Sequence, residues 1–179
     1  MKYKIALIGC GRISFKHIEA FVAMQDKVDL VAVCDPVAER AEEKKLEYGK
    51  TVSNASVQVF ADYKEMLSVC KPDLVTIATE SGKHKDIAVY CLQNGAHVIC
   101  EKPMALSTSD AQQMIDTAKQ YGKTLAVCFQ NRFNAPVVKA REAYEKGRFG
   151  KMLHGMIQVR WNRRNPCGKT RMVIRRRMY

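Results

Sequence analysis

Along the first 128 positions of this 179-residue chain, short continuous apolar runs alternate with stretches in which apolar residues recur at helical spacing. Short continuous apolar runs are typical of parallel strands buried on both faces, and here each run is followed by a stretch with helical spacing. The runs predict six strands, at residues 4–8, 28–34, 57–60, 74–78, 97–100 and 124–128. Because strands that alternate with helices pair in parallel through crossover connections, we expect an α/β fold with a doubly wound parallel sheet and helices on both faces.

The helical stretches predict which side chains pack against this sheet. In the first helix the expected inward face is made by Ile13, His17, Phe21 and Met24. In the helix before Gly122 the expected inward face is made by Ala111, Met114, Ile115 and Ala118. Ser107 and Asp110 match an N-terminal capping arrangement for that helix, and Gly95 is suited to end the preceding helix in a left-handed conformation.

The pattern of apolar and polar residues changes after residue 128. Asn134 to Pro136 opens a helix that ends near Gly147, and residues 151–162 then alternate apolar and polar side chains, as half-buried strands of antiparallel sheets do. We expect three segments: a first domain over 1–128, the truncated start of an α+β antiparallel-sheet domain over 129–165, and a basic tail over 166–179.

The net charge of +12 invites a nucleic-acid function, but its distribution argues against one. Eight of the 30 basic groups, and no acidic group, lie within residues 160–179. The rest of the chain is nearly balanced, and the tail lacks the interleaved aromatic residues of a nucleic-acid surface. We therefore expect no nucleic-acid partner.

The cysteines and the apolar runs argue against several other classes of protein. The seven cysteines include no C-x-x-C pair, and most lie in apolar strand or helix patterns, so buried reduced thiols fit better than disulfides or a metal site. No apolar run has membrane-spanning length, and no signal cleavage site follows the first strand. We expect no metal, no membrane partner and a cytoplasmic location.

The segment Gly9-Cys10-Gly11-Arg12-Ile13-Ser14 joins the first predicted strand to the first predicted helix. In a Rossmann-type fold such a turn binds the pyrophosphate of a dinucleotide, because its glycines permit a tight turn and close approach while the helix N-terminus offers free N–H groups. The residues expected to bind the dinucleotide are Gly9, Gly11, Arg12 and Ile13. The alternative is a structural glycine turn in another α/β fold.

Asp35 ends the second predicted strand, 26 residues after Gly9. An acidic residue at this place accepts hydrogen bonds from the ribose hydroxyls of NAD and repels the additional phosphate of NADP. Pro36 follows it, where an Arg could clamp that phosphate, so we expect NAD rather than NADP. A helix N-cap is the alternative role for Asp35, and the two roles are compatible.

Glu101-Lys102-Pro103 directly follows the strand predicted at 97–100. A charged pair at the end of a buried parallel strand is costly unless it is paired or serves a ligand. A Lys at this edge can hydrogen-bond a substrate hydroxyl and assist its proton transfer. Lys102 is therefore the candidate catalytic residue, and a plain surface loop is the alternative.

Two more polar segments follow strands at this edge. Thr79 to His84 follows the strand at 74–78 and would border the dinucleotide, although His84 also fits an ordinary helix start. Residues 130–134 follow the last strand, and their three amide side chains and one Arg can bind sugar hydroxyls or a carboxylate. A polar interdomain turn is the alternative for this second segment.

These elements, in this order, resemble the Gfo/Idh/MocA family (glucose–fructose oxidoreductase, inositol dehydrogenase, MocA) over residues 3 to about 165. The motifs that carry the resemblance read here as Gly9 with Gly11, Asp35, Thr79 with His84, Glu101-Lys102-Pro103, and Asn131-Arg132-Phe133. Within the family, residues 130–132 and 160–163 look like those of enzymes that oxidise the 3-hydroxyl of UDP-N-acetylglucosamine-type sugars or of their uronic acids.

The resemblance implies an NAD(P)-dependent oxidoreductase that transfers hydride between a sugar or nucleotide-sugar hydroxyl and nicotinamide. It also implies that Lys102 is the catalytic lysine, that Glu101, Lys102 and Asn131 contact the cofactor, and that full-length relatives form homo-oligomers. The substrate-binding residues that it implies are Lys102, Gln130, Asn131, Arg132, Arg160 and Trp161.

The chain departs from the family pattern in its last segment. Family members continue with a large antiparallel-sheet domain that completes the proton relay and holds the sugar, whereas residues 166–179 do not resemble that continuation. A second hypothesis is therefore a cofactor-binding but catalytically incomplete fragment or pseudoenzyme. A basic-tailed regulatory or nucleic-acid-binding protein is the third.

Overall fold

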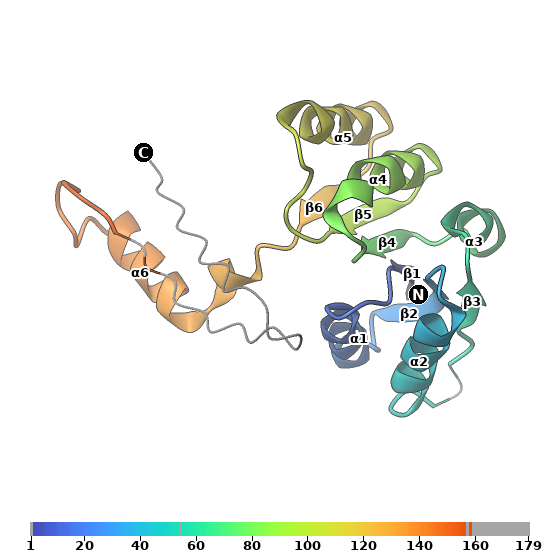
Figure 1. Ribbon diagram of the computed structural model, residues 1–179. Helices are drawn as coiled ribbons and strands as arrows, with labels where there is room; N and C mark the ends of the chain where they lie inside the picture. The colour runs from blue at the N-terminus through green and yellow to red at the C-terminus, as the bar shows by residue number, and fades with distance from the viewer. Residues whose placement is uncertain (1, 54, 157, 159–179) are drawn as a thin grey trace, which may run out of the picture. The chain divides into compact units, whose positions relative to one another are not determined.

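The computed structural model describes residues 2–53, 55–156 and 158 (Figure 1). The chain divides into two compact units, Met1–Gln130 and Asn131–Tyr179. Within the described part, the first unit holds one sheet, formed by β1 (Tyr3–Ile8), β2 (Val28–Cys34), β3 (Gln58–Phe60), β4 (Leu74–Ile77), β5 (His97–Cys100) and β6 (Leu125–Val127).

The strands lie in the order β3-β2-β1-β4-β5-β6, and every neighbouring pair is parallel. The chain therefore runs outward from β1 to one edge, returns to the centre at β4, and runs outward to the other edge. This order is that of a Rossmann-type doubly wound sheet, so the predicted fold class is confirmed. The direction reverses between β1 and β4, where sheets of this kind bind their ligands.

Helices cover both faces of the sheet (Figure 1). They are α1 (Ser14–Ala23), α2 (Ala38–Gly49), α3 (Tyr63–Cys70), η1 (Ser81–Lys83), α4 (His84–Gln93) and α5 (Thr108–Gln120). Alternate residues of β1 enter two separate apolar cores, with Ile5 and Leu7 on the side of α1 and α2, and Ala6 and Ile8 on the side of α3, α4 and α5. Both faces of β1 are buried, which explains its continuous apolar run.

The buried faces of two helices differ from the prediction. The buried residues of α1 are Ser14, His17, Ile18 and Phe21. The predicted Ile13 and Met24 are instead partly exposed, because they are the N-cap and C-cap residues and lie outside the helical turns that face the sheet. On α5, Met114 and Ala118 are buried as predicted, whereas Ile115 is exposed.

The predicted helix ends are confirmed in detail. The Ser107 hydroxyl accepts a hydrogen bond from the Asp110 backbone N–H at 3.1 Å, so it caps α5. Gly95 follows α4 with a φ of 89°, which is the left-handed conformation expected there.

The described part of the second unit contains η2, which starts at the end of the first unit (Gln130–Phe133), and α6 (Ala135–Glu145). No side chain of α6 is buried. The strand predicted over 151–162 is not present at residues 151–156 and 158, because a strand needs a hydrogen-bonded partner and none pairs with them in the described chain. Residues 157 and 159–179, which include Arg160, Trp161 and the basic tail, lie outside the described residues.

Among the residues that the structure covers, no helix is both long and apolar enough to cross a bilayer. The same residues contain no group of three or more His, Cys, Asp or Glu side chains that could hold a metal ion.

Candidate cofactor site

The carboxyl ends of all six strands meet in one row across the sheet. Each neighbouring pair in that row is in register, in the order Phe60, Cys34, Ile8, Ile77, Cys100 and Val127. The next residue along three of these strands is Asp35, Gly9 or Glu101. The topology therefore brings together, at one edge, three groups that the sequence separates by up to 92 positions.

Gly9 is fixed at the point where β1 passes the end of β4. Its φ is 92°, and its backbone N–H donates to the Cys34 carbonyl at 2.8 Å. A Cβ at this position would lie 2.7 Å from the Ala78 carbonyl carbon and from the Thr79 nitrogen. Only glycine accommodates both the backbone conformation and this close approach, so the turn is as tight as a phosphate-binding turn requires.

The start of α1 offers hydrogen-bond donors that the protein does not use. In the described chain, the backbone N–H groups of Gly11, Arg12 and Ile13 donate no hydrogen bond to a protein acceptor. The first turn of α1 contains no acidic residue, and a Cβ at Gly11 would meet nothing within 4 Å. Free N–H groups beside open space at a helix N-terminus suit an anion such as a pyrophosphate.

The turn borders a hollow of about 470 Å³, lined by Cys10, Gly11, Arg12, Arg40, Glu43 and Lys44. The Lys44 ammonium is paired with Glu47 at 2.6 Å and with Glu43 at 3.2 Å. Arg12 and Arg40, in contrast, form no ion pair with any described residue, so the hollow carries two uncompensated positive charges. Sequence reasoning missed Arg40, whose signal was a basic residue at the start of the helix that follows the second strand.

Asp35 lies buried beneath this turn. Its Oδ2 accepts from the Cys10 backbone N–H at 2.8 Å, and its Oδ1 accepts from the Val37 N–H at 2.9 Å. The N-cap of α2 is Val37, without a side-chain cap, so the alternative role of Asp35 as that N-cap is wrong. Each carboxylate oxygen still has acceptor capacity, so the predicted contact with a ribose hydroxyl stays a prediction.

His84 begins α4 and is only 1% exposed. Its Nδ1 lies 2.9 Å from the Pro103 carbonyl oxygen, and its Nε2 lies 3.0 Å from that of Thr79. The ring thus ties the end of β4 to the segment after β5. A ring enclosed in this way has no free edge for a ligand. The structure therefore favours a role for His84 in positioning the two loops, rather than the direct cofactor contact that we expected. Thr79 itself is half-buried.

Glu101 and Lys102 follow β5 but face different surroundings. The Glu101 backbone N–H donates to the Ile77 carbonyl at 2.9 Å, which holds the residue beside β4. Its side chain is buried, with Oε1 at 3.2 Å from His17 Nε2 and Oε2 accepting from the Lys102 backbone N–H at 3.2 Å. Lys102 is exposed and forms no ion pair within the described chain, so its ammonium is available to a ligand.

His17 is the second residue that sequence reasoning missed as part of the site, since it was identified only as one position on a helix face. Burial lowers the pKa of its imidazole, and the neighbouring Glu101 carboxylate partly opposes that effect. A neutral ring donates one hydrogen bond, and the geometry directs it from Nε2 to Glu101.

The remaining predicted site residues lie at or beyond the boundary between the two units. Gln130 ends the first unit, and Asn131 and Arg132 begin the second; all three are exposed. Arg160 and Trp161 lie outside the described residues. The roles of these five residues stay predictions.

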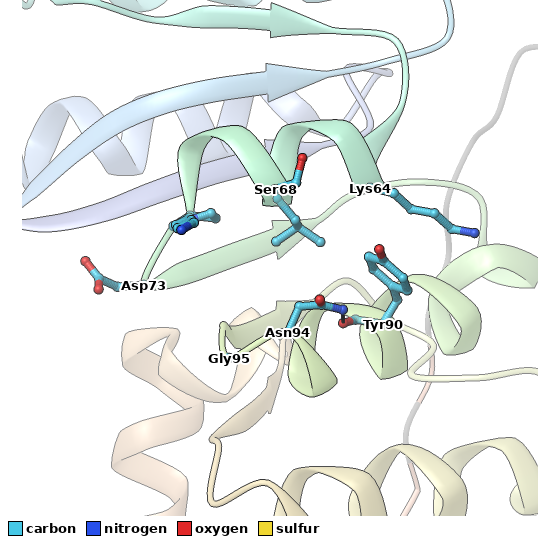
Figure 2. Close-up of a pocket in the computed structure, with 9 residues that line it drawn as sticks. Lys64, Ser68, Asp73, Tyr90, Asn94 and Gly95 are labelled. Carbon is cyan, nitrogen blue, oxygen red and sulfur yellow. Dashed lines mark hydrogen bonds between the residues drawn. The ribbon is translucent and has the colours of Figure 1, made fainter.

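A second hollow of about 300 Å³ lies at the opposite edge of the sheet, where α3 and α4 end and β4 begins (Figure 2). The Lys64 ammonium lies 5.3 Å from the centroid of the Tyr90 ring, and the Asn94 side chain donates to the Tyr90 carbonyl at 2.8 Å. These groups are engaged with one another, and the hollow is away from the carboxyl ends of the strands. It is therefore a weaker candidate than the hollow beside the glycine turn.

Comparison with known proteins agrees with this geometry. The Gfo/Idh/MocA family model, described as an oxidoreductase family with an NAD-binding Rossmann fold, matches residues 3–129. The D-glucoside 3-dehydrogenase of Escherichia coli K12 is 34% identical over 149 residues, which are 83% of this chain and 41% of the relative.

Two solved structures match as well. The WlbA dehydrogenase from Bordetella pertussis, in complex with NADH and UDP-GlcNAcA, has a TM-score of 0.77 at 35% identity and covers 84% of this chain and 44% of its own. The UDP-N-acetylglucosamine 3-dehydrogenase GnnA from Acidithiobacillus ferrooxidans has a TM-score of 0.69 at 26% identity. The match covers 80% of this chain and 43% of the GnnA chain. The chain thus spans about two fifths of the length of these relatives.

Proposed function

This chain belongs to the Gfo/Idh/MocA oxidoreductase family and has its NAD-binding Rossmann fold, and from that premise we propose that it forms the cofactor site of a sugar dehydrogenase. The observation that carries the proposal is the glycine turn at the β1–β4 crevice, with Gly9 against Ala78 and three unused N–H groups beside it. This arrangement is the one that a dinucleotide pyrophosphate requires.

The residues of this edge fit NAD. The N–H groups of Gly11, Arg12 and Ile13 would bind the pyrophosphate, with Arg12 and Arg40 adding positive charge, and Asp35 would accept from a ribose hydroxyl. Bound NAD would supply the hydride acceptor. NADP is disfavoured because its additional phosphate would approach the Asp35 carboxylate.

Lys102 is the proposed catalytic residue. Its exposed ammonium directly follows β5, and it is free to hydrogen-bond a sugar hydroxyl and to take part in the transfer of that hydroxyl proton. The buried Glu101 beside it anchors the segment and lies where contact with the nicotinamide ribose is proposed.

The proposed substrate is a sugar or nucleotide sugar that is oxidised at a ring hydroxyl. Two of the relatives are named as 3-dehydrogenases, and the WlbA structure contains UDP-GlcNAcA, a sugar with a carboxylate. Gln130, Asn131 and Arg132 offer amide and guanidinium groups that match hydroxyls and a carboxylate. For the complete enzyme we propose a homo-oligomer.

A second candidate function is cofactor binding without turnover by these 179 residues. The observation that favours it is that the relatives are more than twice as long as the matched region, while Lys102 is the one residue of this edge to which we assign proton transfer. General acid–base catalysis contributes on the order of 10²–10⁴-fold, and only when the reacting carbon is held near the nicotinamide. NADH production that depends on Lys102, with UDP-GlcNAcA as substrate, would exclude this candidate.

Titration of the chain with NADH, followed by its fluorescence, tests the proposed cofactor site. We expect saturable NADH binding by the wild type. Gly11→Val should abolish it, because the new side chain would fill the open space beside the turn that the pyrophosphate would occupy. Gly49→Val is the matched control, since a Cβ at this position, at the end of α2, also meets nothing within 4 Å. A folded wild-type chain that does not bind NADH would refute the proposal.

A further inference from the structure

One buried hydrogen bond joins the two halves of the sheet at the cofactor site. His17 lies on α1, which belongs to the β1–β3 half, and Glu101 follows β5 in the β4–β6 half. Their Nε2 and Oε1 atoms are 3.2 Å apart, across 84 positions of sequence. Among the described residues it is the one side-chain-to-side-chain hydrogen bond between the two halves.

The two ends of this bond lead directly to the two functional parts of the site. One turn before His17, α1 starts at the phosphate-binding turn, and one residue after Glu101 stands Lys102. The His17–Glu101 link therefore ties the start of α1 to the segment that carries Lys102, in addition to the pairing of β1, β4 and β5, and contributes to the spacing between the phosphate-binding N–H groups and that segment. A dinucleotide must reach from one to the other, so an error in that spacing weakens its binding.

The surroundings keep the pair in one arrangement. Both residues are 9% exposed, and the Phe21 ring lies 6.4 Å from the His17 ring, centroid to centroid. The second carboxylate oxygen of Glu101 is held by the Lys102 N–H, so the carboxylate has a donor at each oxygen. Without the His17 ring, Oε1 would be left in a buried position without its donor.

We propose that His17 is a positioning residue of the cofactor site, which holds Glu101 and Lys102 at the correct distance from the phosphate-binding turn. This inference rests on the proposed function, because it assigns a role within the NAD site. It predicts that NADH binding depends on the hydrogen-bond donor at His17 Nε2 and not on the imidazole ring itself.

Two amide substitutions in the 179-residue chain separate the donor from the ring. The amide nitrogen of His17→Gln can occupy about the place of Nε2 and reach Glu101, whereas that of His17→Asn is about one bond too short. With NADH as the probe, we expect the Asn variant to bind about tenfold more weakly than the wild type, the scale of one hydrogen bond to a charged group. The Gln variant should stay within about threefold of the wild type.

Removal of the partner completes the test. In a Glu101→Leu background, His17→Asn should change NADH affinity less than about threefold, because no carboxylate remains to be held. Equal affinities of the Asn and Gln variants, or a tenfold loss that persists in the Leu background, would overturn the inference. If the Asn variant does not fold, a Gln variant that binds NADH more than tenfold more weakly than the wild type overturns it alone.

A readout that needs no cofactor distinguishes this inference from the proposed function. The backbone amide resonance of Lys102, whose N–H is bonded to Glu101, should shift in His17→Asn and return toward its wild-type position in His17→Gln. An unchanged resonance in the Asn variant would refute the positioning role of His17. A wild-type chain that fails to bind NADH would instead refute the proposed function.

Discussion

Helices α1 and α6 have nearly the same length, 10 and 11 residues, and both carry apolar residues at helical spacing. Four residues of α1 are buried, and two of them, Ile18 and Phe21, lie in a core shared with the sheet and α2, whereas α6 buries none within the described chain. The two helices show that apolar periodicity predicts where a helix forms but not whether another element covers it. The first unit has that cover on both faces of its sheet, whereas no described residue buries a side chain of α6.

The largest expected effect tests this difference with one residue type. Leu92 is fully buried in α4, and Leu153 of the second unit is 86% exposed. Leu92→Ala should lower the free energy of unfolding by about 2–5 kcal/mol, because it removes a packed side chain and leaves a cavity. Leu153→Ala should change it by less than about 0.5 kcal/mol. Urea unfolding followed by circular dichroism measures both, and equal losses would show that the second unit is packed as tightly as the first.

Backbone strain gives the next largest effect. Gly9 and Gly147 both have positive φ angles, of 92° and 68°, but only a Cβ at Gly9 would meet a neighbouring backbone, that of Ala78 and Thr79 directly after β4. Gly147→Ala should therefore cost about 1 kcal/mol of stability, from the backbone conformation alone. Gly9→Ala should cost more than about 2 kcal/mol and abolish NADH binding, because the turn must also shift. A Gly9→Ala chain with wild-type melting temperature and NADH affinity would contradict the close approach.

The same contrast explains how much the sequence could predict. The buried parallel strands and the glycine turn were predicted because local pattern and tertiary environment agree there. The His17–Glu101 link and Arg40 were not, since both depend on which distant elements the strand order brings together. The strand at 151–162 was predicted from alternation alone, and alternation supplies no partner strand.

A smaller effect is expected on the preference for NADH over NADPH, which tests the electrostatics of the first unit. Asp35→Ala should weaken NADH binding by about tenfold, or about 1.4 kcal/mol, and narrow the preference over NADPH, because the ribose acceptor, its negative charge and its hydrogen bond to the Cys10 N–H of the glycine turn are lost together. Calorimetric titration with both cofactors measures this. Glu142→Ala, on the exposed α6, is the acidic control and should change neither affinity. Wild-type chain that binds NADPH as tightly as NADH would remove the assignment of Asp35.

The smallest expected effect is the pH dependence that His17 contributes to stability. Burial lowers the pKa of His17 in the folded chain below its ordinary value of 6.5, so as pH falls through about 6.5 the unfolded chain takes up the proton first. Protonation then favours unfolding, and the stabilisation that is complete above pH 6.5 is lost between that value and the lowered folded-state pKa. One such group changes the free energy of unfolding by at most about 1.4 kcal/mol per pH unit.

Denaturant unfolding at pH 7.5, 6.5 and 5.5 should show a shallower decline of the free energy of unfolding for His17→Gln than for the wild type. His154→Gln, at an exposed position of the second unit, is the matched control and should keep the wild-type decline. Parallel curves for the wild type and His17→Gln would mean that the buried ring carries no such penalty.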